Sequence, residues 1–162
     1  MNIYEFAKQM EKDGENYYRE LGAKAQHDGV KIIFDLLANE EVKHFNILDQ
    51  LSKNIENAEL VDTTILNDAK NIFIEMKEGG QIPESSITEA DLYKKAVEIE
   101  EKSVQFYEEK ANEVENEAHK QILKRMAEEE KKHKFLMLSL VEFITRPQTW
   151  VENAEFHKLD EY

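Results

Sequence analysis

The sequence predicts an all-α protein with a single bundle of four long helices. Two observations favour this fold class. Apolar residues recur at helical spacing along four long segments. The chain also has only two prolines and five glycines, too few for a sheet protein with many turns. Its 162 residues suffice for one domain with a substantial core, rather than for two domains.

The first two helices are expected at about 3–26 and about 30–53, on either side of a short polar turn that ends in Gly29. Each carries a stripe of apolar residues at spacings of three and four, as one buried face of a helix requires. The stripe of the first helix comprises Ile3, Phe6, Met10, Gly14, Tyr17 and Leu21. The stripe of the second comprises Val30, Ile33, Phe34, Leu37, His44, Leu48 and Leu51.

The other two helices are expected at about 89–114 and about 117–145. Thr88 and Asp91 resemble a capping box, which predicts that a helix begins there. Pro147 ends the last helix, because a proline disfavours the helical conformation in the residue before it. The two short turns imply two antiparallel hairpins.

One long crossover, at about 52–88, joins the hairpins, and a short helix could form within it at 65–77. The predicted domain organisation is therefore one bundle over residues 1–145, followed by a short C-terminal tail over 146–162. The tail carries Trp150, and we expect it to pack on the bundle or across the interface of a homodimer.

Composition excludes several classes of function. The formal net charge of −14 repels phosphate backbones and anionic lipids, so we expect neither nucleic acid nor a membrane as partner. The chain has no cysteine, which excludes disulfides and thiolate metal sites. No signal peptide and no apolar run of about 20 residues is visible, so we expect a cytoplasmic protein.

The two hairpins carry the same polar residues on their inner faces. A shift of 89 residues places Glu100 on Glu11, Glu130 on Glu41, His133 on His44, and Tyr107 on Tyr18. This agreement favours a duplicated hairpin. The four glutamates and two histidines all fall on the apolar stripes, where leucine would be expected.

Position along the bundle supports the same grouping. Residues equally far from the turn of an antiparallel hairpin are level, and Glu11 and Glu41 are centred on position 26, beside the first turn. Glu100 and Glu130 are centred on position 115, at the second turn. Each hairpin therefore brings one lone glutamate to within about a turn of a Glu-x-x-His pair, given the rise of ~1.5 Å per residue.

Four carboxylates buried together are very costly unless something neutralises them. Two divalent cations would balance their charge, and carboxylate oxygen with imidazole nitrogen is a ligand set for iron, manganese or zinc. Glu41 and Glu130 are the natural bridges between two metal ions, and His44 and His133 would each bind one of them.

These residues give the chain a resemblance to the ferritin-like superfamily and, within it, to the rubrerythrin family. The matching residues are Glu11, Glu41, His44, Glu100, Glu130 and His133. The resemblance implies a ferritin-like bundle with two iron ions. Tyr18 and Tyr107 match aromatic positions near such centres, where a tyrosine can hydrogen-bond a ligand carboxylate and support catalysis; the alternative role for both is packing in the core.

The resemblance further implies an oxidoreductase that reduces hydrogen peroxide or dioxygen during oxidative stress. Without cysteines the chain lacks the iron–sulfur domain that many rubrerythrins carry, so an external electron-donor protein would be needed. These proteins also commonly carry an extra carboxylate beside the ligand equivalent to Glu100, and here the neighbouring positions are Ala96, Val97, Ser103 and Val104. The alternative is a non-catalytic bundle that handles iron or holds a structural metal.

The remaining histidines, His27, His119 and His157, have no partner at ligand spacing, so we expect them to be structural or exposed. Glu40 and Glu129 directly precede two of the candidate ligands, and we expect them to face outward or sideways.

Overall fold

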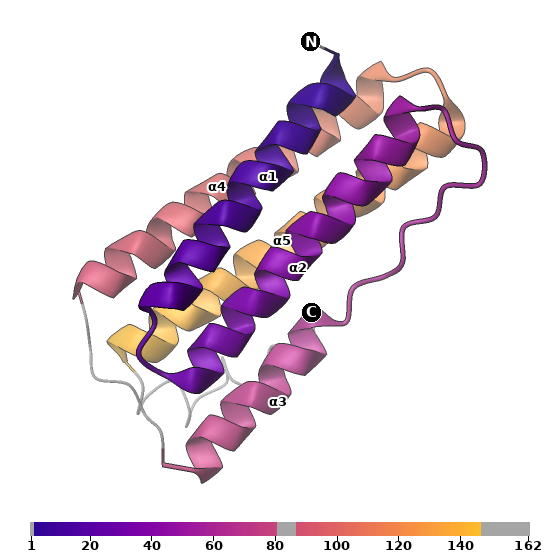
Figure 1. The fold of residues 1–162 in the computed structure, drawn as a ribbon. Coiled ribbons are helices and arrows are strands. Elements are labelled where there is room, and N and C mark those ends of the chain that lie inside the picture. Colours follow the sequence, from indigo (N-terminus) through magenta and orange to yellow (C-terminus); the bar gives the residue numbers. More distant parts are fainter. Residues whose placement is uncertain (1, 81–86, 147–162) are drawn as a thin grey trace.

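The computed structural model describes residues 2–80 and 87–146, and these form five helices (Figure 1). The long helices make two antiparallel hairpins that pack into one bundle, which confirms the predicted fold class. The first hairpin comprises α1 (Ile3–Lys24) and α2 (Asp28–Ser52), and the second comprises α4 (Ile87–Glu113) and α5 (Glu117–Thr145). The crossover contains α3 (Ile65–Glu78). The predicted C-terminal tail, from residue 147 on, lies outside the described residues.

Side-chain caps fix the starts of two long helices. The Asn2 side chain accepts a hydrogen bond from the backbone N–H of Glu5 at 2.9 Å, at the start of α1. Asn116 caps α5 in the same way, accepting from the N–H of His119 at 3.1 Å. Such caps stabilise a helix by about 1 kcal/mol. The expected capping residue Thr88 already lies inside α4, so the capping-box interpretation is wrong.

The crossover helix α3 packs against the start of α2, near the first turn. Gly29 makes this approach possible, because a Cβ atom at that position would clash with Met76 Sδ and would lie 3.2 Å from Ile72 Cγ2. The apolar face of α3, with Ala69 and Phe73 fully buried, thereby joins the core of the bundle.

The core consists of two apolar clusters with a polar layer between them. One cluster contains Tyr18, Phe34, Tyr93 and Phe143 with the buried face of α3, and the other contains Leu48, Tyr107, Leu123 and Met126. On each long helix the candidate ligands lie between residues of the two clusters, as Glu11 does between Ala7 and Tyr18. The ionisable groups are thus enclosed by apolar packing on both sides.

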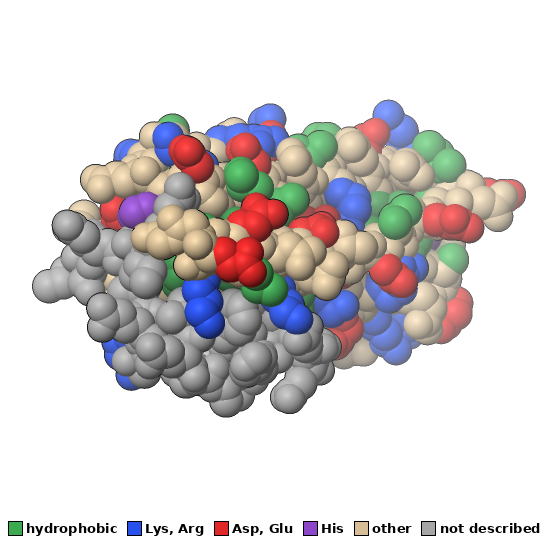
Figure 2. All heavy atoms as spheres, turned by 90° about the horizontal axis from the view of Figure 1, so that it is seen from below, with side chains coloured by type: hydrophobic (Ala, Val, Ile, Leu, Met, Phe, Trp, Pro, Cys, Tyr) green, Lys and Arg blue, Asp and Glu red, His purple; other side chains and the backbone are tan. Residues whose placement is uncertain are grey.

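The outer surface matches the charged composition. Seen from below Figure 1, acidic and basic side chains are interspersed over the described part of the surface, with small hydrophobic areas between them (Figure 2). Among the described helices, none is both long and apolar enough to cross a bilayer.

Candidate metal centre

The polar layer gathers all six of the predicted ligands in the middle of the bundle. Glu11 comes from α1, Glu41 and His44 from α2, Glu100 from α4, and Glu130 and His133 from α5. Each is buried: Glu41 is 5% exposed, and the other five are at most 1% exposed. The helical register that the sequence indicated therefore points these side chains at one another.

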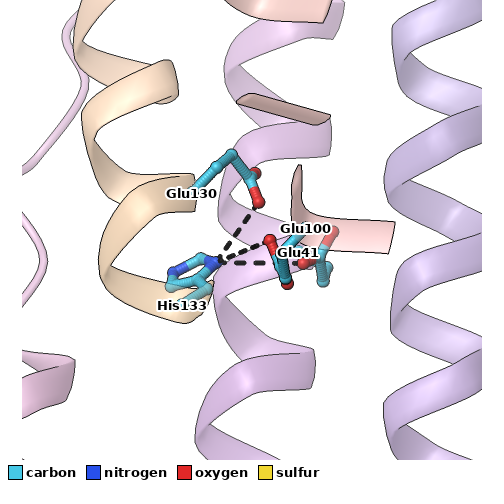
Figure 3. A group of neighbouring side chains, drawn as sticks. All are labelled: Glu41, Glu100, Glu130 and His133. Atoms are coloured by element: carbon cyan, nitrogen blue, oxygen red, sulfur yellow. Dashed lines mark ion pairs between the residues drawn. The ribbon is translucent and has the colours of Figure 1, made fainter. Parts of the chain in front are cut away.

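They form two groups that share one carboxylate. In the first, ligand atoms of Glu41, Glu100, Glu130 and His133 all lie within 4.8 Å of one another (Figure 3). In the second, the same is true of Glu11, His44 and Glu130. Glu130 is thus common to both groups, whereas Glu41, the other expected bridge, belongs to the first group. The bridging roles of both residues stay predictions.

Both imidazole rings turn the same nitrogen, Nδ1, toward the carboxylates. His44 Nδ1 lies 2.8 Å from Glu130 and 3.5 Å from Glu11. His133 Nδ1 lies 3.5 Å from Glu130, 3.8 Å from Glu100 and 4.0 Å from Glu41. The two rings stack with their centroids 5.7 Å apart. Nδ1 is therefore the nitrogen that each histidine presents to the centre.

The outer nitrogen of each ring meets a carboxylate from the opposite hairpin. His44 Nε2 lies 2.8 Å from Glu129, and His133 Nε2 lies 3.2 Å from Glu40. We expected Glu40 and Glu129 to face outward or sideways. This expectation is wrong, because both carboxylates contact a histidine of the centre, Glu129 is only 4% exposed, and Glu40 is partly buried. A carboxylate on the outer nitrogen fixes the tautomer and orientation of a ligating imidazole. Their 89-residue spacing was the signal that could have revealed them.

The crossover closes this side of the centre. The backbone N–H of Thr63 donates to Glu129 at 3.1 Å, and the Thr63 hydroxyl donates to Glu40. Lys43 Nζ lies 2.9 Å from Glu129 and 3.3 Å from Glu40. One threonine and one lysine thus hold both of the carboxylates that orient the histidines.

The two predicted tyrosines also cross between hairpins. The hydroxyl of Tyr18 donates to Glu100 at 2.5 Å, and the hydroxyl of Tyr107 donates to Glu11 at 2.5 Å. Both tyrosines are fully buried. Burial raises the pKa of each hydroxyl well above its usual range, and the nearby glutamates raise it further, so both keep their protons.

Protons occupy the centre when no metal is bound. Burial raises the pKa of Glu41 and of Glu100 well above the usual range, and the neighbouring carboxylates add to the rise. Burial also opposes charge on Glu130, but the adjacent Glu100, His133 and His44 side chains outweigh it and lower its pKa. The facing carboxylates likewise outweigh burial at the histidines, raising the pKa of His133 to about 10 and that of His44 well above its usual range.

The donor atoms fit two metal ions of the iron type. Among the described residues, four buried polar atoms have no hydrogen-bond partner: Glu11 Oε2, Glu100 Oε2, Glu130 Oε2 and His133 Nδ1. Unpaired buried groups of this kind are costly, and all four belong to the two groups of candidate ligands. A cation between them would satisfy them, and oxygen with imidazole nitrogen suits iron, manganese or zinc.

The other histidines lie apart from this centre. His119 is buried near the start of α5, where its Nδ1 is 2.6 Å from the Tyr4 hydroxyl. His27 precedes α2 and is partly exposed. His157 falls outside the described residues.

Comparison with known proteins gives one result. The family model described as Rubrerythrin matches residues 2–141, which include all four long helices almost completely. No curated protein and no solved structure matched the chain.

Proposed function

Because the chain belongs to the rubrerythrin family, we propose that its centre binds two iron ions and reduces hydrogen peroxide or dioxygen with electrons from an external donor protein. The observation that supports this most is the pair of buried carboxylate and imidazole groups that share Glu130. A single-metal site would need no second group. A purely structural polar layer would be expected to satisfy its own donors and acceptors.

Each residue of the centre has a proposed task. Glu41, Glu100, Glu130 and His133 would hold one metal ion, and Glu11, His44 and Glu130 would hold the other. When bound, an iron pair supplies the two electrons needed to break an O–O bond. Reduction of hydrogen peroxide to two waters also consumes two protons, and the hydroxyls of Tyr18 and Tyr107 hold protons beside the ligand carboxylates.

A second candidate function is non-catalytic: a bundle that handles iron or holds a structural metal. The helix that carries Glu100 favours it, since the positions three and four residues away are Ala96, Val97, Ser103 and Val104. The extra carboxylate of the peroxide-reducing relatives would lie there. Its absence leaves the metal cage intact but removes one group that could take part in turnover.

The experiment separates the two candidates. Protein purified without oxygen is analysed for metal content, reduced, and mixed with peroxide or air. Rapid oxidation by peroxide that is lost in Glu41→Ala and Glu130→Ala supports the enzyme. The matched control is Glu128→Ala, which removes an exposed glutamate from the same helix and should leave the rate unchanged. Two stoichiometric zinc ions without a redox response would refute the enzyme, and a large assembly in light scattering would favour iron storage.

A further inference from the structure

An apolar groove runs between α1 and α4, on the face of the bundle formed by the two helices that carry the lone glutamates. Its volume is about 510 Å³, many times the ~30 Å³ that a water molecule occupies in the liquid. Met10, Gly14 and Tyr17 line it from α1, and Ile99, Ser103 and Phe106 line it from α4. One acidic and one basic side chain also contribute to its wall. The groove can therefore admit a small molecule.

The wall of the groove at Gly14 lies directly against the centre. A Cβ atom on Gly14 would lie 2.7 Å from Glu41 Oε2 and 3.0 Å from Glu41 Cδ. The missing side chain thus leaves the Glu41 carboxylate adjacent to the groove. Glu41 is also the most exposed of the six candidate ligands, at 5% against at most 1% for the others. Both observations put Glu41 where the centre comes closest to solvent.

Ser103 is the counterpart of Gly14 in the second hairpin, at the same 89-residue spacing. Its hydroxyl donates to the backbone oxygen of Ile99 at 3.1 Å, within its own helix. The serine side chain is small and uncharged. On the opposite side of the centre, where the outer nitrogens of the histidines lie, Thr63 and Lys43 cover the carboxylates. The side of the centre that faces α1 and α4 is therefore bordered by two small residues, Gly14 and Ser103, and by the groove, whereas the crossover and Lys43 cover the histidine side.

We propose that this groove is the route by which a small neutral oxidant reaches the centre, and that Gly14 and Ser103 keep the route open. The identity of the oxidant, hydrogen peroxide or dioxygen, rests on the proposed function. The lining is mostly apolar, and its one acidic and one basic side chain have opposite charges, so the groove favours neutral molecules over ions, which would lose their hydration there. Glu41 is the first group of the centre that an entering molecule meets.

The test adds bulk to the groove without touching a candidate ligand. Ser103→Phe is compared with the wild-type protein after both are loaded with ferrous iron, and the probe is nitric oxide, a small neutral molecule that binds reduced iron without turnover. Stopped-flow absorbance gives the association rate. We expect Ser103→Phe to slow association about tenfold or more, equivalent to ~1.4 kcal/mol on the barrier. Iron content and the amount of nitric oxide bound at equilibrium should stay unchanged.

The matched control is Gln105→Phe, which adds the same ring on the same helix. Gln105 lines a separate groove, between α4 and α5, so this variant should associate at the wild-type rate. Ser103→Leu provides a second, less bulky variant and should give a smaller decrease. Wild-type rates in both Ser103 variants, or equal slowing in Gln105→Phe, would overturn the route, as would wild-type protein that binds no nitric oxide. Nitric oxide binding without oxidation by peroxide would instead refute the proposed function and leave the route intact.

Discussion

The substitution Gly14→Ala should affect the metal-free and the metal-loaded protein in opposite ways. Gly14 lies in the interior of α1, where alanine is more favourable than glycine by about 1 kcal/mol. The added Cβ would lie 2.7 Å from Glu41 Oε2, so the carboxylate must move. It can do so without metal, because it is the end of a flexible side chain. We expect the metal-free protein to gain about 1 kcal/mol and metal affinity to fall about tenfold.

Thermal denaturation followed by circular dichroism measures both effects. For a domain of this size, 1 kcal/mol corresponds to about 2–4 °C in the midpoint. The midpoint of metal-free Gly14→Ala should therefore rise by about that amount. Bound metal raises the midpoint according to its affinity, so this increase should be smaller in the variant than in the wild-type protein. Metal titration of the variant gives the affinity directly.

The control is Gly22→Ala, the same change in the same helix. A Cβ atom there would lie 3.4 Å from Phe34 Cβ, an ordinary contact, and 3.9 Å from the Lys31 backbone oxygen. It should raise both midpoints about equally. If Gly14→Ala also raised both midpoints equally and kept the wild-type metal affinity, the space at Gly14 would not be needed by Glu41, and the reasoning would fail.

Three further substitutions test the surroundings of the centre. Thr63→Val removes the hydroxyl donor to Glu40, so metal titration should show about tenfold weaker binding. Thr63→Ser keeps a hydroxyl and should bind metal as the wild type does. An equal loss of metal affinity in both variants would contradict the role of the hydroxyl. Burial opposes charge on Glu40, but its hydrogen bond with His133 outweighs burial and lowers the pKa of Glu40 to about 2. The Glu40 carboxylate therefore stabilises the metal-free fold at pH values above the pKa of an unfolded glutamate, and this contribution is lost as the pH falls through about 2. Glu40→Gln should remove this pH dependence, which amounts to about 3 kcal/mol in total and to about half of that between about pH 5 and about pH 3. Urea unfolding of both proteins at these two pH values measures it, and an equal loss of stability in the variant and the wild type would contradict the role of Glu40. Gly29→Ala should lower the free energy of unfolding by about 1–3 kcal/mol through the clash with Met76, which lowers the thermal midpoint. A raised midpoint would show that α3 can shift freely.

Helical periodicity predicted the four long helices because each buries one continuous stripe. The six inner residues were predictable for the same reason: each interrupts an apolar stripe with an ionisable group, and the 89-residue repeat shows the interruption twice. Glu40 and Glu129 were missed because the neighbouring position on a helix is turned by about 100°, which assigns it to the wet face. Whether that face is exposed to solvent depends on how closely α2 and α5 approach each other, and no pattern within one helix encodes this distance.

The roles of Thr63 and Gly14 also needed the structure. Thr63 lies in the crossover, where no periodicity indicates the direction of a side chain. Gly14 fitted the apolar stripe of α1, and a stripe position says only that a residue faces inward. That its missing Cβ makes room for Glu41 depends on the separation of α1 and α2.

The contacts of the centre explain why one polar layer can hold this bundle together. The hydrogen bonds that link it run from one hairpin to the other, and they come in pairs related by the repeat: Tyr18 to Glu100 and Tyr107 to Glu11, His44 to Glu129 and His133 to Glu40. Either hairpin alone would hold half of the ligands without their partners. Protons on Glu41, Glu100 and both histidines offset part of the negative charge of the layer when it is metal-free, but four of its buried atoms still have no hydrogen-bond partner. Metal binding is therefore an exchange of cations for these protons, and it stabilises the docking of the hairpins more strongly as the pH rises and the protons leave more readily.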